Sequence, residues 1–483
     1  MKNSSTRTMT AKRIAVAVAA VCATMSAPSF AAGSDMKALM DLLLKKGVIT
    51  QQEYDQNIQA AAENEAFKEK RLADDVAKLN KIAEKNKDTG SVMKNGFGVQ
   101  SADGRTTMQL TGRLHMDYRS YSSNVPSNFY QDKLDIRRAR LGVKGQIEKD
   151  WKYEIVGTYG GNGTTEGLGE TATILDVAYA DYAANPAMQF RFGKFKMPFS
   201  LEQLGTSNAI DFMERSLANQ VEGEWVPAKE TGVMVFGSPM SGVSYGLALS
   251  KGRANTSVTM DKPDTIGRVT ANVAELMGRK DVVTHFGLGY SVGNVAAFTP
   301  ASGRTEARES SAFFTSSPAV VVGSTRTRQG LEAALAYDAF KVQSEFIRIS
   351  YDQTGTAAAP VERGLNVSYV QAVWNITGEN HNYSNSAGTF GWIKPKQAFT
   401  EKGSLGAWQV GVRYSKLSAG EFGGASGFTN GAEAWTYGLT WFVNDNARMM
   451  LNYVDTAFNS NVGTANSLRS NEKAMMARAQ YWF

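Results

Sequence analysis

The residues with the clearest chemistry are basic side chains that recur at every second position of alternating segments. In residues 108–119, one set of alternate positions is apolar, and the other includes Arg113, His115, Asp117 and Arg119. Side chains of a β-strand point to opposite faces with period two, so the polar set shares one face. An arginine on that face offers a planar fork of N–H donors, which can hold an oxyanion through two hydrogen bonds. The pattern predicts a strand with one apolar face and one face suited to anions.

The length of this segment favours a strand that crosses a membrane. A strand rises ~3.3 Å per residue, so a strand of about twelve residues tilted by ~45° spans a hydrocarbon layer of ~25–30 Å. A strand of a soluble β-sandwich also alternates, but it is usually about half that long.

The start of the chain is typical of an export signal, which we assign to residues 1–31. An apolar stretch, Ile14–Thr24, precedes the small-x-small cleavage site Ser29-Phe30-Ala31. The basic residues before it are Lys2, Arg7, Lys12 and Arg13. Cys22 is the only cysteine and lies within the signal, so the predicted mature chain has no disulfide.

The charge balance excludes a strongly basic nucleic-acid-binding domain. Removing four of the 52 basic residues with the signal leaves 48 against 46 acidic residues, a net charge of +2. No run of 18 apolar residues follows the signal, so a membrane role requires strands.

Residues 35–92 form a helical segment by composition, which is rich in Ala, Lys, Glu, Asp and Leu. Thr50 and Glu53 have the spacing of a capping box. Leu72, Val76, Leu79 and Ala83 have the spacing of a coiled-coil seam. The segment is expected in the periplasm, either as a self-associating coiled coil or as a solvated spacer.

Residues 93–483 alternate repeatedly and predict a pore-forming barrel. Sixteen segments fit: 108–119, 139–147, 153–159, 177–182, 188–193, 231–236, 245–249, 268–273, 286–292, 331–337, 342–346, 366–374, 408–414, 435–443, 449–453 and 473–483. Tight turns and long polar loops alternate between them, as in outer-membrane barrels. The fold class is therefore an all-β membrane protein, a sixteen-stranded antiparallel transmembrane β-barrel with a short N-terminal α-helical or coiled-coil segment. Register is left open at 136–138 and 345–349, where the alternation breaks.

The last strand carries a second membrane signal. Alternate residues from Met475 to Tyr481 are apolar, and Phe483 is the final residue on that face. A terminal phenylalanine of this kind resembles the signal that outer-membrane barrels present to their assembly machinery, which is a predicted partner together with outer-membrane lipid. A soluble sandwich would leave so many outward aromatic residues uncovered.

If the apolar faces contact lipid, the polar faces line the lumen. The expected inward cations are Arg113, Arg119, Arg138, Arg140, Lys144, Arg191, Arg413, Arg448 and Arg478. The expected inward acids are Asp117, Glu154, Asp181, Glu332 and Glu345. Nine cations against five acids favour anions in a pore, because rings of Arg and Lys replace part of an anion's hydration shell. The alternative is that these arginines pair with acids and only brace the barrel.

Two long insertions are candidates for narrowing the lumen. Residues 194–230 carry four cations against six acids, an excess that also suits a general diffusion pore. Residues 296–325 carry Arg304 and Arg308, and Arg326 and Arg328 follow directly.

An enzyme is not expected, and neither is a cofactor or a metal. The pentapeptide 289–293 matches the nucleophile-elbow pattern, but it continues a strand instead of turning into a helix. His115, His285 and His381 lack metal-ligand spacing, and no phosphate-binding loop motif is present.

Three motifs resemble the phosphate-selective porin O/P family. They are Asp135-Ile136-Arg137-Arg138-Ala139-Arg140-Leu141, Gly193-Lys194-Phe195-Lys196-Met197-Pro198-Phe199-Ser200-Leu201-Glu202, and Asn375-Ile376-Thr377-Gly378-Glu379 continuing to Lys394-Pro395-Lys396. The resemblance implies a homotrimer of sixteen-stranded barrels in a Gram-negative outer membrane, in which arginines lead down to lysines at a constriction. It also implies that residues 378–403 fold back into the barrel and present Lys394 and Lys396. The dense arginine ladder of strictly phosphate-selective members is not plain here. Its counterparts, Arg304, Arg308, Arg326 and Arg328, are mixed with Glu306 and Glu309.

The sequence thus predicts a passive, anion-preferring outer-membrane porin for phosphate or related small oxyanions. Two alternatives stay open. One is a weakly selective pore for small nutrients, and the other is an envelope-tethering protein whose barrel is only an anchor.

Overall fold

The computed structural model describes most of the chain outside the predicted signal. The described residues are 41–47, 49–85, 98–101, 103–122, 132–159, 174–221, 225–252, 263–295, 302–308, 312–321, 323–356, 359–400, 403–423, 425–463 and 468–483. The assigned signal, residues 1–31, lies outside them. The chain divides into two compact units, Met1–Asp88 and Thr89–Phe483.

The first unit contains helical residues 41–45 and the long helix α3 (Gln51–Lys85). The capping box at its start is confirmed. The Thr50 N–H donates to Glu53 Oε2 at 2.8 Å, and the Glu53 N–H donates to Thr50 Oγ1 at 3.3 Å. Leu72 and Val76 are exposed in the single chain, and the coiled-coil seam stays a prediction. None of the described helices is both long and apolar enough to cross a membrane.

The second unit is built on sixteen long strands. These are β2 (Thr107–Tyr121), β3 (Lys133–Ile147), β4 (Trp151–Thr158), β5 (Ile174–Asn185), β6 (Met188–Lys196), β7 (Lys229–Met240), β8 (Val243–Ser250), β9 (Asp264–Asn272), β10 (Val282–Asn294), β13 (Thr325–Tyr337), β14 (Phe340–Thr356), β15 (Ala359–Asn375), β18 (Ala407–Ser418), β19 (Gly431–Asn444), β20 (Ala447–Val462) and β21 (Arg469–Trp482). Each of the sixteen predicted segments falls on one of them.

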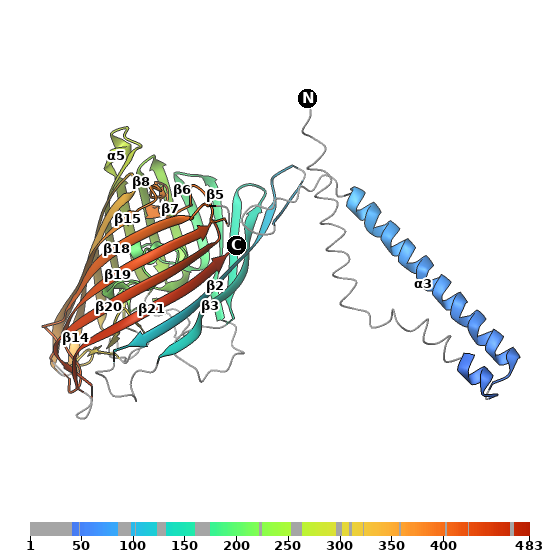
Figure 1. Cartoon of the computed structure of the whole chain (residues 1–483). Helices are drawn as coiled ribbons and strands as arrows, with labels where there is room; N and C mark the ends of the chain where they lie inside the picture. Colours follow the sequence, from blue (N-terminus) through green and yellow to red (C-terminus); the bar gives the residue numbers. More distant parts are fainter. Residues whose placement is uncertain are drawn as a thin grey trace. The chain divides into compact units, whose positions relative to one another are not determined.

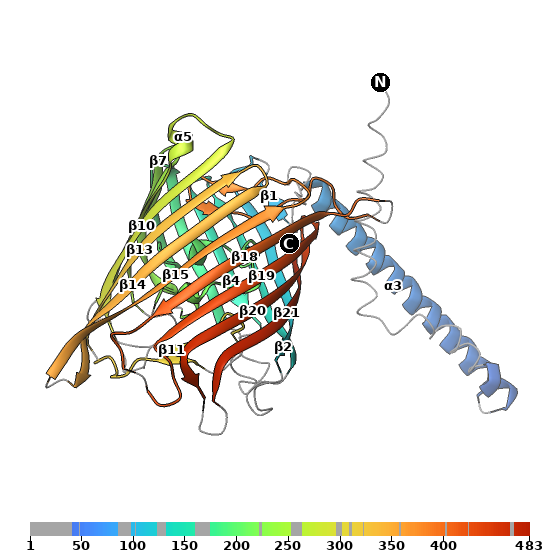
Figure 2. The same cartoon turned by 60° about the vertical axis from the view of Figure 1, so that its left-hand side comes forward.

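The strands form a closed antiparallel barrel (Figures 1 and 2). Successive strands pair with each other, and β21 pairs with β2, where Trp482 lies opposite Arg113. The short strand β1 (Gly98–Gln100) pairs with the start of β2, beyond the end of β21. Closure leaves no free sheet edge, which is the condition for a sheet to cross lipid. The predicted fold class is confirmed for the barrel.

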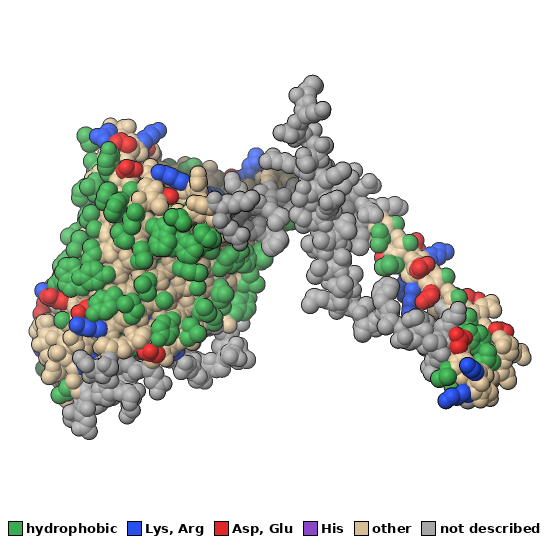
Figure 3. Space-filling model, in the orientation of Figure 1, with side chains coloured by type: hydrophobic (Ala, Val, Ile, Leu, Met, Phe, Trp, Pro, Cys, Tyr) green, Lys and Arg blue, Asp and Glu red, His purple; other side chains and the backbone are tan. Residues whose placement is uncertain are grey.

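Alternation separates the two surfaces of the barrel wall. On β2, Leu114, Met116 and Tyr118 are exposed on the outside, while His115 and Asp117 between them are fully buried inside. The outer surface is correspondingly apolar over the face seen in Figure 3, with charged side chains gathered near the two ends of the barrel. This distribution matches a surface in contact with lipid hydrocarbon.

The connections differ between the two ends of the barrel. At one end the turns are short, as at 148–150 and 338–339, and one of them holds the one-turn helix α5 (Val273–Leu276). That end also carries the long connection 376–406, with the small hairpin β16 (Tyr383–Ser384) and β17 (Thr389–Phe390). At the other end, residues 197–228 include α4 (Leu201–Leu204) and the 3-10 turn η1 (Leu217–Asn219), and residues 295–324 include β11 (Ser302–Gly303) and β12 (Phe314–Thr315).

The two stretches with uncertain register have different explanations. On β3, His115 lies opposite Arg138 and Met116 lies opposite Ile136, so Arg137 is the extra residue of a β-bulge. Arg137 and Arg138 are both buried. On β14 the ladder runs through residues 345–349 without a bulge, and its only irregularity with β15 lies later, between Tyr351 and Thr354. Ile347 and Ile349 face inward but are apolar, because they pack against inserted loop residues.

The C-terminal residue closes the barrel seam. The Phe483 N–H donates to the Gly112 carbonyl at 3.1 Å, and the Gly112 N–H donates to the Phe483 carbonyl at 3.0 Å. The ring of Phe483 covers Gly112, where a Cβ atom would lie 2.4 Å from the ring. Gly112 is therefore the residue that leaves room for the terminal aromatic ring.

The cap of α3 gives a pH-dependent prediction. Hydrogen bonds from the Thr50 backbone and side chain lower the pKa of Glu53 below its ordinary 4.5. Because the pKa of Glu53 is lower in the folded helix, the cap stabilises the helix above pH 4.5. This stabilisation is lost as the pH falls through the lowered pKa. Thr50→Ala should reduce hydrogen-exchange protection of residues 51–54 by about fivefold at neutral pH. The mid-helix variant Gln59→Ala is the control, and equal effects of both variants would contradict a specific cap.

Candidate functional site

Much of the barrel interior is filled by the two long insertions. Phe199 and Trp225 of the first insertion and Phe313 and Phe314 of the second are fully buried. They form one apolar cluster with inward residues of β14, β15, β18 and β19. Both insertions therefore enter the lumen, and the side of the barrel beside these strands is packed and not open.

The acids of the first insertion point toward the barrel wall. Glu214 accepts from Arg137 at 2.9 Å, from Arg119 at 3.1 Å and from Arg478 at 2.9 Å. Burial alone would raise the pKa of Glu214, but the guanidinium groups of Arg137, Arg478 and Arg138 hold it well below its ordinary range. Glu214 is therefore an anion that compensates several wall arginines at once.

Three further loop acids also bind cations of the barrel wall. Glu202 lies 3.3 Å from Arg413, and Glu306 of the second insertion lies 2.5 Å from the same arginine. Asp211 lies 2.7 Å from Lys341 of β14. Glu202, Asp211 and Glu214 of the first insertion are thus each paired with a cation of the wall.

Several of the predicted inward arginines brace the structure in this way. Arg478 also binds Asp117 at 2.6 Å and 2.7 Å, and Arg119 binds the same carboxylate at 2.6 Å. Arg448 donates to the carbonyls of Ile210 at 3.0 Å and Ser207 at 3.3 Å. For these residues and for Arg413, the alternative of a purely bracing role fits the geometry.

A second braced group lies on β9, β10 and β13. Arg326 pairs with Asp264 at 3.0 Å, and Arg328 donates to Ser291 at 2.9 Å. Arg268 forms a two-bond pair with Glu332 at 2.9 Å and 2.6 Å and donates to the carbonyls of Ala387 and Gly388 in the β16–β17 hairpin.

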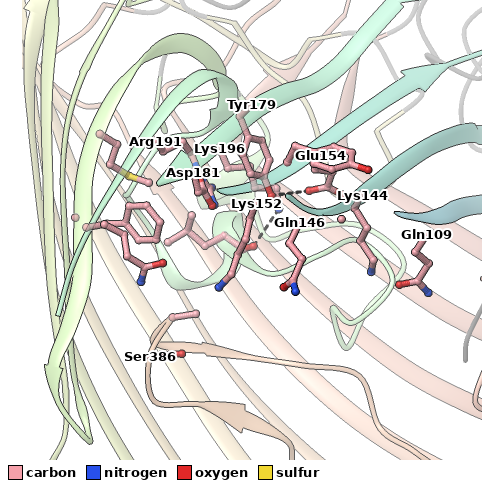
Figure 4. A pocket seen from close by; sticks show the side chains of 18 of the residues that line it. Gln109, Lys144, Gln146, Lys152, Glu154, Tyr179, Asp181, Arg191, Lys196 and Ser386 are labelled. Atoms are coloured by element: carbon pink, nitrogen blue, oxygen red, sulfur yellow. Dashed lines mark hydrogen bonds and ion pairs between the residues drawn. The ribbon is translucent and has the colours of Figure 1, made fainter. Parts of the chain in front are cut away.

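Two adjoining cavities lie along the wall formed by β2 to β9. The wider one, of about 800 Å³, lies on the side of the short turns, and Figure 4 shows side chains that line it. The charged residues that line it are Lys144, Lys152, Glu154, Asp181, Arg191, Lys196 and Arg268. Ser386 and Ala387 of the β16–β17 hairpin line it as well, so the connection 376–406 reaches into the lumen.

The narrower part is a cavity of about 340 Å³ with a strongly basic lining. Its cations are Arg113, Arg137, Arg138, Arg140, Arg191, Lys196, Arg215, Lys229 and Arg308. Its acids are Glu154 and Asp176. Nine cations and two acids line this cavity directly, and two of the cations also bind acids outside the lining, Arg137 with Glu214 and Arg191 with Asp181.

The two cavities meet at Glu154, Tyr179, Arg191, Lys196 and Leu204, which line both. Here the Arg191 guanidinium stacks 3.9 Å above the Tyr179 ring and forms two hydrogen bonds to Asp181, at 2.6 Å and 2.7 Å. The Tyr179 hydroxyl donates to Glu154 at 2.7 Å, as the dashed lines in Figure 4 show. These bonds hold the side chains at the junction in fixed positions.

The remaining predicted residues lie elsewhere. Lys194 occupies an outward position in the ladder of β6. It pairs with Ala178 and Thr231, whose neighbours Tyr179 and Glu230 face inward. The Lys194 Nζ donates to the Leu175 carbonyl at 2.6 Å. Lys394 and Lys396 are exposed after the β16–β17 hairpin, so the part of the 378–403 connection that lines the cavity is Ser386 and Ala387. Arg304 is half-buried in the second insertion.

Five lining cations are absent from the sequence-based set, namely Arg137, Lys152, Arg215, Lys229 and Arg268, and Arg215 and Lys229 belong to the first insertion. Arg137 reaches the lumen only because of the bulge, and the broken alternation at 136–138 is the signal that marks it. Lys152 lies one residue before the predicted run 153–159, and extending that run would have found it. Arg268 is the first residue of the predicted run 268–273, but its inward direction was not assigned from the sequence.

The described residues offer no feature of a hydrolytic or metal site. Ser291, within the elbow-like pentapeptide, lies in the middle of β10 and accepts from Arg328. No group of three His, Cys, Asp or Glu side chains in the described ranges is placed to hold a metal ion.

Comparison with known proteins agrees with this geometry. The model of the family described as phosphate-selective porin O and P matches residues 108–483. The chain belongs to this family. It is therefore a β-barrel porin of the Gram-negative outer membrane. No curated protein sequence matches the chain.

Several solved structures are similar to this porin in fold. The outer membrane channel DcaP of Acinetobacter baumannii has a TM-score of 0.50 at 12% identity, covering 81% of this chain and 100% of that chain. An anion-selective porin from Comamonas acidovorans has a TM-score of 0.49 at 11% identity, covering 78% and 100%. OmpT of Vibrio cholerae, in a trimer form, has a TM-score of 0.47 at 9% identity, covering 78% and 99%.

Removal of a bracing arginine should destabilise this porin. Arg478→Met leaves the buried carboxylates of Asp117 and Glu214 without one of their cations, which should lower the free energy of unfolding by about 3–5 kcal/mol. Arg348→Met is the control, since its pair with Glu421 is partly exposed and contributes about 0–1 kcal/mol. Urea unfolding of the detergent-solubilised barrel measures both. Similar losses in the two variants would show that the buried network is not a stabilising unit.

Proposed function

We propose that this porin is a passive, anion-preferring channel for small oxyanions such as phosphate. The observation that carries the proposal is the lining of the 340 Å³ cavity, with nine cations and two acids. Exposed cations lower the energy of an anion that has shed part of its water, and they raise the energy of a cation. The passage therefore favours anions although the mature chain is predicted to be almost neutral.

The position of the loop acids supports this proposal over a weakly selective pore. A general diffusion pore would have acids of the inserted loop facing a basic wall across the open constriction. Here Glu202 and Asp211 bind Arg413 and Lys341, which do not line the narrow cavity, and Glu214 is enclosed by wall arginines and does not line the cavity itself. Arg215 and Lys196 are the charged residues beside the opening on the loop side. The acidic excess of the insertion is thus compatible with an anionic pathway.

Transport in this proposal is electrodiffusion through several weak sites. An anion enters among Lys144, Lys152 and Arg191, and it meets the arginines of the narrower cavity one after another. Multiple sites of moderate affinity permit both entry and release, whereas one tight site would trap the ion.

The same proposal covers assembly and topology. We propose a homotrimer, export through the signal of residues 1–31, and a periplasmic location for the helical segment 35–92. We also propose that the assembly machinery recognises the last strand through Phe483. The pairing of Phe483 with Gly112 at the barrel seam supports that role, because this residue lies where the barrel closes.

The ion preference can be measured in planar bilayers under a salt gradient. The reversal potential should have the sign of an anion-selective channel, because the narrow cavity carries a large positive excess. A reversal potential of cation sign would reject the anion proposal. Deleting residues 35–88 should leave the conductance in place, and its loss would favour the tethering alternative instead.

Neutralising lining residues should lower the anion preference stepwise. A single charge about 10 Å from an ion in water contributes ~0.4 kcal/mol, or about a twofold change in permeability ratio. Arg140→Gln, and then Arg140→Gln with Lys152→Gln, should lower the chloride-to-potassium permeability ratio by about twofold and fourfold. Lys416→Gln is the control, because this lysine is exposed on the outside and pairs with Glu433. An unchanged ratio in the first two variants would remove them from the pathway.

Phosphate preference requires a separate measurement. Chloride current through the wild-type channel should fall when phosphate is added at millimolar concentration, because arginine forks hold oxyanions more strongly than halides. The absence of any block at that level would leave an anion channel without phosphate preference.

A further inference from the structure

Lys196 lies at the junction of the two cavities, but its ammonium group is already fully engaged. Its Nζ donates to the carbonyls of Gln203 at 2.8 Å, Leu204 at 3.1 Å and Gly205 at 2.7 Å. A lysine ammonium has three N–H donors. All three are thus accounted for by main-chain oxygens of the inserted loop, and none is left for a passing anion.

The carbonyls that Lys196 binds belong to the end of the one-turn helix α4. Arg215 donates to the same group of oxygens, those of Glu202 at 3.1 Å, Gln203 at 3.4 Å and Gly205 at 2.9 Å. A helix end presents unsatisfied carbonyls with partial negative charge, and two cations offset that charge here.

The other end of α4 is held by the opposite wall of the barrel. The N–H groups of Leu201 and Glu202 donate to the carboxylate of Glu345 on β14, at 3.0 Å and 2.7 Å. The turn is therefore fixed from both sides, by an acid of β14 at its start and by Lys196 and Arg215 at its end. Its residues Gln203 and Leu204 line the narrow cavity.

We propose that Lys196 is a positioning residue of the channel. It sets the aperture by fixing the turn Gln203–Gly205, and it is not a ligand for the permeating anion. The proposal rests on the proposed function only for the location of the pathway. The family resemblance implies that Lys194 and Lys196 line the constriction of the anion path. In the structure, Lys194 lies at an outward position of the ladder and Lys196 binds the inserted loop.

The test measures the mobility of the turn directly. Cys22 is the only cysteine of the chain and lies in the predicted signal, so Leu204→Cys provides a single thiol for a nitroxide spin label. In the mature porin without residues 1–31, Lys196→Met should sharpen the label's spectrum and raise the rate of thiol modification by about fivefold or more, because three hydrogen bonds to the turn are lost. Lys152→Met is the matched control, a lysine that lines the wider cavity, and it should leave the label as in the parent.

Conservative replacement separates position from charge. Lys196→Arg keeps a cation with several donors and should restore the immobile spectrum, and single-channel recordings should show excess open-channel noise in Lys196→Met alone. Heat-modifiable migration in gels confirms that each variant has formed its barrel. A label at position 204 that is equally immobile in Lys196→Met and in the parent would overturn the proposal. A reversal potential of cation sign would reject the proposed function, but it would not affect the proposed role of Lys196 in fixing the turn.

Discussion

The structure depends on compensating the charge that sixteen alternating strands place inside the barrel. Buried arginines are costly unless acids or carbonyls satisfy them. In this porin the partners come from the inserted loops, with Glu214 shared by Arg119, Arg137 and Arg478. The barrel wall and the loops therefore stabilise each other through these buried ion pairs.

This compensation also divides the lumen into two functional regions. Beside β14 to β21, loop acids and apolar residues such as Phe313 and Trp225 fill the interior. Beside β2 to β9, the two cavities remain unfilled, and Arg215 and the small turn of the loop lie beside them. In the proposed channel, charge preference would follow from which face of the loop meets these cavities, and not from the net charge of the loop.

Most of the barrel could be predicted because its signal is local. A strand's alternation needs only neighbouring residues, so all sixteen strands were found, including weak ones such as 268–273. The prediction assumed polar inner faces, and it was incomplete where inserted loops and not water fill the barrel. Ile347 and Ile349 break the expected polar pattern because they pack against the loop, and Arg137 faces inward through a bulge that alternation cannot express.

The sequence by itself determined the closed barrel, its apolar outer surface, the cap of α3 and a surplus of cations on the inner face, because period-two alternation and short-range spacing encode them. Only the tertiary structure decided which cations brace and which line the passage. That division depends on contacts between residues far apart in the chain, such as Arg478 with Glu214 and Lys196 with the α4 turn. Alternation can place a lysine or an arginine inside, but it cannot say whether a loop oxygen has already taken its hydrogen bonds.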